Sequence, residues 1–210
     1  MLDDTKLQTA ITTLTKKDKN LQAVVKKYGP PPLWNREPGF PSLVKIILEQ
    51  QVSLASAQAA YNKLLDTINP LTPEKFLTLD DTSVKKIGFS RQKTRYCRIL
   101  AESIKNEELD LDSLSNKDDQ TVMKTLTSLK GIGPWTASIY LLMVLLRQDV
   151  WPEGDLALLV SMKEVYGLDE IPSKEMAARI ADDWKPWRSV AARILWHNYL
   201  SLRADKRKGL

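Results

Sequence analysis

The stretch from Leu129 to Leu156 holds the residues whose types and spacing could do chemistry. It contains the turn Gly131-Ile132-Gly133 between two helix-like segments, and then Asp155, twenty residues after Trp135. Two glycines permit unusual backbone angles, and the helix that follows begins with unpaired N–H groups. Such donors at the positive end of a helix suit a phosphate oxygen. A carboxylate near a phosphate-binding turn indicates chemistry on a nucleic acid.

Each of these features also has a purely structural interpretation. A bare glycine pair is often a plain turn between helices, and aspartate is a preferred N-cap residue. Asp155 precedes LALLVSMKEVY, a clear helix that stops at Gly167, so spacing alone favours the cap. The two roles are compatible, because a capping side chain is held rigidly. Glu153, two residues earlier, is expected to face solvent.

Composition excludes several classes of function. The 210 residues are 43% hydrophobic and 27% charged, which allows a buried core in one or two domains. The single cysteine, Cys97, excludes an internal disulfide and a four-cysteine iron–sulfur cluster, and the single histidine argues against zinc. The net charge of +5 is compatible with a polyanionic partner. Without a membrane-length apolar run or a signal-peptide pattern, we expect no membrane contact and a cytoplasmic, nucleoid-associated or nuclear location.

The elements that must position these residues are helices. Apolar residues recur at helical spacing through most of the chain, and no segment alternates as a strand does. Ser42, Thr72 and Ser90 stand where helix N-caps are expected, and the last helix is expected over 186–203. The sequence therefore predicts an all-α fold with two helical lobes and a cleft between them.

Several motifs, taken in order, resemble a known family. They read ILEQQVSLASA, IGFSRQKTRY, LKGIGPWTA, the Gly-Asp pair that ends at Asp155, and DDWKPWRSVAARILW. Together they are similar to the helix-hairpin-helix (HhH-GPD) DNA glycosylases, and more narrowly to 3-methyladenine DNA glycosylase II, the AlkA type. The resemblance covers about residues 38 to 200.

The resemblance implies a single glycosylase unit over residues 1–210, with the DNA lesion held between two lobes. One lobe is expected over about 38–128, and the other from the N-terminal segment plus about 129–205. The implied activity belongs to base excision repair: hydrolysis of the N-glycosidic bond of alkylated purines such as 3-methyladenine and 7-methylguanine, which leaves an abasic site. The implied partner is double-stranded DNA with alkylated bases, bound by a monomer.

The resemblance also implies the catalytic residue. Asp155 falls at the position of the family's catalytic aspartate. A carboxylate there can stabilise the oxocarbenium-like sugar and orient the attacking water. Trp135 stands where bifunctional relatives carry a nucleophilic lysine, so no lyase activity is expected.

Further positions match the family's base pocket, wedge and DNA contacts. The base-pocket candidates are Trp135, Trp196, Trp34 and Phe40, for which core packing is the alternative. The side chain that fills the gap left by a flipped nucleotide is expected to be Gln51, or Gln50. The phosphate-binding candidates are Gly131, Ile132, Gly133, Ser90 and Lys93. The carbonyls of Thr127, Leu129 and Ile132 match a monovalent-cation (Na⁺ or K⁺) site, and no cofactor is expected to be required.

Two other functions remain open. A non-catalytic helix-hairpin-helix module would bind DNA through the same turn, but it would need neither Asp155 nor the tryptophans. A glycosylase for another damaged base would share the fold. The tryptophan at the lysine position and the absence of a cysteine cluster argue against the main branches of that group.

Overall fold

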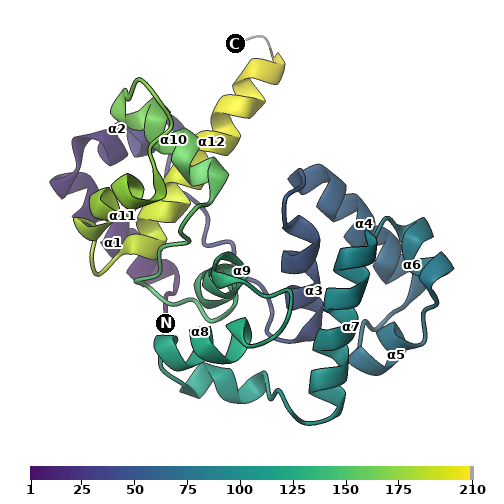
Figure 1. The fold of residues 1–210 in the computed structure, drawn as a ribbon. Helices are drawn as coiled ribbons and strands as arrows, with labels where there is room; N and C mark the ends of the chain where they lie inside the picture. Colours follow the sequence, from purple (N-terminus) through teal and green to yellow (C-terminus); the bar gives the residue numbers. More distant parts are fainter. Residues whose placement is uncertain (209–210) are drawn as a thin grey trace. The chain divides into compact units, whose positions relative to one another are not determined.

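The computed structural model describes residues 1–208, which fold into helices joined by turns and loops (Figure 1). No β-strand occurs within these residues, which confirms the predicted all-α fold. None of their helices is long and apolar enough to cross a membrane. The chain divides into two compact units. Unit 1 combines Met1–Asn35 with the chain from Leu146 onward, and unit 2 is the continuous segment Arg36–Leu145.

Unit 1 is built around the long C-terminal helix. Its helices are α1 (Asp4–Lys17), α2 (Lys19–Tyr28), α10 (Leu156–Tyr166), α11 (Lys174–Asp182) and α12 (Arg188–Lys208). Helix α12, yellow in Figure 1, packs against each of the other four. Its residues Val190, Ala191 and Ile194 have no exposed surface, so the first half of α12 is the core of this unit.

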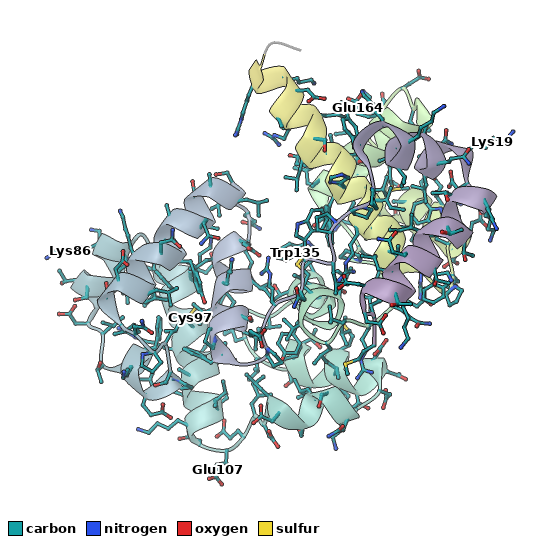
Figure 2. The ribbon with its side chains drawn as sticks, turned by 180° about the vertical axis from the view of Figure 1, so that it is seen from behind. Lys19, Lys86, Cys97, Glu107, Trp135 and Glu164 are labelled. Carbon is teal, nitrogen blue, oxygen red and sulfur yellow. The ribbon has the colours of Figure 1, made fainter. Side chains whose placement is uncertain are left out.

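Unit 2 contains the remaining helices. They are α3 (Phe40–Glu49), α4 (Leu54–Thr67), α5 (Pro73–Leu77), α6 (Asp81–Ile87), α7 (Arg91–Lys105), η1 (Asp112–Asn116), α8 (Asp119–Thr127), α9 (Pro134–Ile139) and η2 (Tyr140–Val144). Helices α3 and α7 pack together at the centre, where Cys97 is fully buried (Figure 2). Burial raises the pKa of the Cys97 thiol, so this cysteine is an inert core residue.

The glycine hairpin lies in unit 2. Helix α8 packs on α9, and α3 packs on both α9 and η2, so these contacts join the hairpin to the segment before it. The units therefore divide after Leu145, whereas the sequence interpretation divides the lobes near residue 128. Residues 140–144 form a single π-helical turn, a feature that apolar periodicity does not distinguish from an α-helix.

Side-chain caps explain most helix starts. Thr72 and Ser90 accept hydrogen bonds from the N–H groups of Lys75 and Lys93, as predicted. The predicted cap at Ser42 is wrong. Helix α3 begins three residues earlier, after Gly39, and the hydroxyl of Ser42 instead donates to the carbonyl of Glu37 at 2.6 Å. Pro41 at the second helical position explains the earlier start, because proline fits the first turn of a helix.

Asp18 links the N-terminal helices of unit 1 to its C-terminal ones. One carboxylate oxygen caps α2 by accepting from the N–H groups of Asn20 and Leu21. The other accepts from the hydroxyl of Tyr166 and from Nε1 of Trp184, the latter at 3.0 Å. Burial and the bond to Asp18 raise the pKa of Tyr166, so its hydroxyl keeps its proton. Residues 1–35 are therefore an integral part of unit 1.

Candidate active site

Asp155 begins helix α10 and is 8% exposed. Its Oδ1 atom accepts a hydrogen bond from the N–H of Leu158 at 3.0 Å, which is the predicted N-cap geometry. The same oxygen accepts from Nε1 of Trp196 at 3.2 Å. A buried carboxylate at the positive end of a helix, held by two hydrogen-bond donors, has a fixed position.

Trp196 reaches Asp155 because α12 packs along α10. Trp196 is itself 8% exposed. Two residues further along α12, the amide of Asn198 donates to the hydroxyl of Ser161 in α10 at 3.0 Å, and both side chains are buried. This second link fixes the register of the two helices. The tryptophan proposed for the base pocket therefore also orients the carboxylate.

The segment that leads to Asp155 is fastened to the start of α12. Arg188 donates from Nε and Nη2 to the two carboxylate oxygens of Asp149, at 2.8 and 3.0 Å. The N–H of Val150 donates to Ser189 Oγ at 2.9 Å. Arg188 and Ser189 thus brace the segment that precedes Asp155 against the start of α12. Glu153 is exposed, as expected.

Trp34 lies in unit 1, beside the helix that carries Trp196. Its ring centroid is 6.2 Å from that of His197, and its φ of +48° is unusual for a tryptophan. Arg193 donates from Nε to the carbonyl of Leu33 at 2.7 Å, which fixes the backbone next to Trp34. Arg193 is fully buried, and burial lowers its pKa to about 10, so the guanidinium stays charged at neutral pH.

The glycine hairpin in unit 2 has the backbone that the sequence indicates. Gly131 has φ +101°, and a Cβ atom there would stand 2.1 Å from Cγ of Tyr96. The N–H of Ile132 donates to the carbonyl of Leu129 at 3.1 Å, and the Ile132 side chain is buried as expected. Gly133 is exposed and caps α9 with no side chain of its own. The N–H groups of this first turn are thus not capped by a side chain of the N-cap residue.

The second expected phosphate-binding turn contains Ser90 and Lys93. Ser90 is exposed, and its hydroxyl caps α7. Lys93, by contrast, is half-buried. Its Nζ donates to the carbonyl of Leu48, at the end of α3, over 2.6 Å. The geometry therefore supports a phosphate contact at Ser90 more than at Lys93.

The structure separates the two wedge candidates. Nε2 of Gln50 donates to the carbonyl of Gly131 and to Oγ1 of Thr136, both at 2.9 Å, so this side chain fastens α3 to the hairpin. Gln51 is exposed and has φ +55°. Strained, exposed residues at the tip of a turn are typical of contact sites. The wedge hypothesis therefore rests on Gln51.

The other two aromatic candidates lie in unit 2. Trp135 is half-buried at the second position of α9. Phe40 is 4% exposed, and its ring packs against Phe76 at 5.9 Å between centroids. A ring enclosed in this way belongs to the core, which argues against Phe40 as a base-pocket residue.

No group of three or more His, Cys, Asp or Glu side chains capable of holding a metal occurs within residues 1–208. The carbonyl of Leu129, one of the expected cation ligands, accepts the Ile132 N–H within the hairpin turn. A carbonyl oxygen has a second lone pair, so this bond is compatible with a cation ligand.

Sequence reasoning missed several residues that hold the site together. The bond from Trp196 to Asp155 joins residues 41 positions apart. The pair Arg36–Glu49 and the bond from Lys93 to Leu48 were also not predicted. The buried role of Arg193 could have been predicted from the sequence. It stands within the apolar run SVAARILW, where a charged residue must find buried acceptors.

For the glycosylase activity that the resemblance implies, Trp196→Phe is expected to lower the single-turnover rate of base release by about tenfold, because it removes a hydrogen bond to the carboxylate while an aromatic ring remains. Single-turnover release of base from alkylated DNA measures this change. Trp187→Phe, another tryptophan of unit 1 that is only half-buried, is the matched control and should behave as wild type. Equal rates for both variants would show that the indole N–H contributes nothing.

Comparisons with known proteins agree with this geometry. Residues 44–186 match the family model described as HhH-GPD superfamily base excision DNA repair protein. The alkylbase DNA glycosidase-like protein mag2 of Schizosaccharomyces pombe is 28% identical over 203 residues, 93% of this chain and 95% of that protein.

Two solved structures have the same fold. The Schizosaccharomyces pombe 3-methyladenine DNA glycosylase, in complex with abasic DNA, has a TM-score of 0.83 at 26% identity, over 90% of this chain and 95% of that one. A DNA-3-methyladenine glycosidase from Bacillus halodurans has a TM-score of 0.74 at 29% identity, over 93% and 91%. The resemblance seen in the motifs around the hairpin is confirmed, and the chain belongs to the HhH-GPD superfamily of base excision DNA repair proteins.

Proposed function

We propose that this protein is a monofunctional DNA glycosylase that hydrolyses the N-glycosidic bond of alkylated purines of the 3-methyladenine and 7-methylguanine type. The observation that carries the proposal is the fixed, buried carboxylate of Asp155 at the start of α10. Relatives and solved structures named as 3-methyladenine glycosylases support the choice of substrate class. The protein acts as a monomer on double-stranded DNA, in the nucleoid or in the nucleus.

The chemistry follows from the charge of the lesion. Alkylation at N3 or N7 makes a purine cationic, so it leaves readily and needs little protonation. The sugar then develops positive charge, which Asp155 stabilises electrostatically. The same carboxylate can orient the attacking water. The hydrogen bonds from Leu158 and Trp196 keep the carboxylate in place, so it needs no rearrangement during the reaction.

The proposed lesion contacts follow the same geometry. The proposed aromatic contacts of the cationic base, which stacks well on electron-rich rings, are Trp34 and the buried Trp196 of unit 1 and Trp135 of unit 2. Gln51 fills the space that the flipped nucleotide leaves. The exposed N–H groups at Gly133 and Ser90 hold the DNA backbone.

The test is release of free base from methylated DNA. The proposal requires that the protein release 3-methyladenine and leave abasic sites. A protein that binds abasic-site DNA but releases no base would instead be the non-catalytic helix-hairpin-helix module. Release of only oxidised or mismatched bases would assign the protein to another branch of the superfamily.

We also expect no lyase step. Trp135 occupies the position of the nucleophilic lysine, and the nearby Lys130 precedes the hairpin turn. Incubation with alkylated DNA and borohydride should therefore give no covalent protein–DNA adduct, while a lysine-dependent glycosylase run in parallel should give one. A trapped adduct would contradict the monofunctional assignment and would direct attention to Lys130.

A monovalent cation in the hairpin is a further part of the proposal. The carbonyls of Thr127, Leu129 and Ile132 are neutral oxygen donors of the kind that Na⁺ or K⁺ prefers, and Leu129 lies in the tight turn that would gather them. Such an ion would supply positive charge beside the phosphate-binding turn.

A further inference from the structure

The backbone at Gln51 needs support from its surroundings. Gln51 is exposed and has φ +55°, a conformation that few residues other than glycine adopt. Such a conformation persists only where neighbouring structure imposes it. Because Gln51 follows directly after the end of α3, the contacts on the last residues of α3 decide where its side chain points.

Lys93 makes one of these contacts. Its Nζ lies 2.6 Å from the carbonyl oxygen of Leu48, and Leu48 is 2% exposed. This carbonyl is one of the last four of α3, which lack partners within the helix, and a cation at a helix C-terminus is favourable. Lys93 is half-buried, and burial lowers the pKa of its ammonium group. The charge is thus partly withdrawn from solvent and directed at the end of α3.

Two other contacts act on the next two residues. Arg36 forms a bidentate pair with Glu49, with both N–O distances 2.9 Å. The Glu49 side chain is 8% exposed, so this pair is well shielded. Gln50 is tied to the hairpin through Gly131. The three residues before Gln51 are therefore each fastened to a different part of unit 2.

We propose that Lys93 is a positioning residue for Gln51: it fixes the end of α3, from which Gln51 projects, rather than binding a DNA phosphate itself. The proposal rests on the wedge role of Gln51 in the proposed function. Without the ammonium donor, the last turn of α3 loses its hydrogen bond to α7, and the turn that presents Gln51 becomes free to relax. Base extrusion then suffers, while the charge contacts with DNA remain.

The test compares Lys93→Met with wild type on two DNA substrates. In one, 7-methylguanine is paired with cytosine. In the other, it lies opposite a tetrahydrofuran abasic analogue. No base pair must then be broken, so extrusion of the base costs less free energy. Lys93→Met is expected to slow excision about tenfold or more on the paired substrate, as for a lost charged hydrogen bond, and no more than about threefold on the unpaired one. Gln51→Ala should show the same pattern.

A double variant and the salt dependence separate positioning from phosphate binding. If Lys93 acts through Gln51, the double variant Lys93→Met/Gln51→Ala should be no slower than the slower single variant. The slope of log Kd against log salt on abasic-site DNA should equal that of wild type. A slope reduced by about one, with uniform losses on both substrates, would identify a phosphate contact and overturn the proposal.

Lys86→Met is the matched control, because it also removes one lysine charge from unit 2. Lys86 is exposed on α6, and Figure 2 shows it at the outer edge of this unit, away from Trp135. It should match wild type on both substrates. A Lys93→Met protein with normal thermal stability that also matches wild type on both would equally overturn the proposal.

A binding measurement keeps the proposal testable if the protein releases no base at all. In DNA with 2-aminopurine next to an abasic analogue, insertion of a wedge unstacks the probe and raises its fluorescence. Wild type should produce this rise, and Lys93→Met should produce a smaller one at saturating protein. If the protein releases no base but the fluorescence still differs between wild type and Lys93→Met, only the proposed activity is refuted. Equal fluorescence in both proteins would refute the role of Lys93.

Discussion

Asp155→Asn is expected to lower base release from alkylated DNA by at least about 100- to 1,000-fold, the range found when a preorganised electrostatic contact to a transition state is removed. The substitution removes the negative charge that faces the developing sugar cation. The Oδ1 atom of asparagine can still accept from Leu158 and Trp196. Asparagine is also a good N-cap, so α10 should remain folded.

The effect is measured by single-turnover excision at saturating protein. Binding to abasic-site DNA should survive, and the melting temperature should change by no more than a few degrees. Glu153→Gln is the matched control, since it removes an exposed carboxylate two residues away and should keep wild-type activity. An Asp155→Asn protein that excises at near wild-type rate would mean that another group performs the chemistry.

Gly131→Ala is expected to have the largest effect on stability. The added Cβ would lie 2.1 Å from Cγ of the Tyr96 ring, and the backbone must keep φ +101°. Strain and overpacking together cost roughly 2 to 6 kcal/mol. For a protein of this size that lowers the melting temperature by on the order of 10 °C, which thermal unfolding followed by circular dichroism will detect.

Gly133→Ala is the natural control for that experiment. A Cβ atom at Gly133 would meet nothing within 4 Å, and its φ of −91° is open to any residue. Its melting temperature should therefore stay within a few degrees of wild type. Combining Gly131→Ala with Tyr96→Ala should restore part of the loss, because it relieves the clash but not the backbone strain. Equal stability of the two alanine variants would contradict the close approach of Tyr96.

Helices and their caps were predictable because their causes are local. Apolar spacing and the caps at Thr72, Ser90 and Asp155 depend on residues within one turn of each other. Ser42 misled for the same reason. It has the right type for a cap, but Phe40 and Pro41 fit the first turn of α3 better.

The hydrogen bonds that hold the site residues in place could not be predicted from local sequence. The bond from Trp196 to Asp155 depends on how α12 packs against α10, and the bond from Lys93 to Leu48 depends on α7 meeting α3. Each donor also suits an ordinary role for its residue type: Trp196 could be an aromatic core residue, and Lys93 a surface cation. Which role it plays is decided by helix packing, which residue spacing does not determine. The same holds for Gln50, which is half-buried, whereas its neighbour Gln51 is of the same type and exposed.

The division of the chain has a consequence for how the protein is made. Unit 2 is continuous, so the ribosome can complete it before unit 1, which needs both residues 1–35 and the chain after Leu145. Domains generally fold as units as they emerge. Asp18, at the junction of α1 and α2, therefore gains its partners Tyr166 and Trp184 only after unit 2 has been synthesised. The hairpin can thus be assembled before Trp196, which holds the carboxylate of Asp155, has been synthesised.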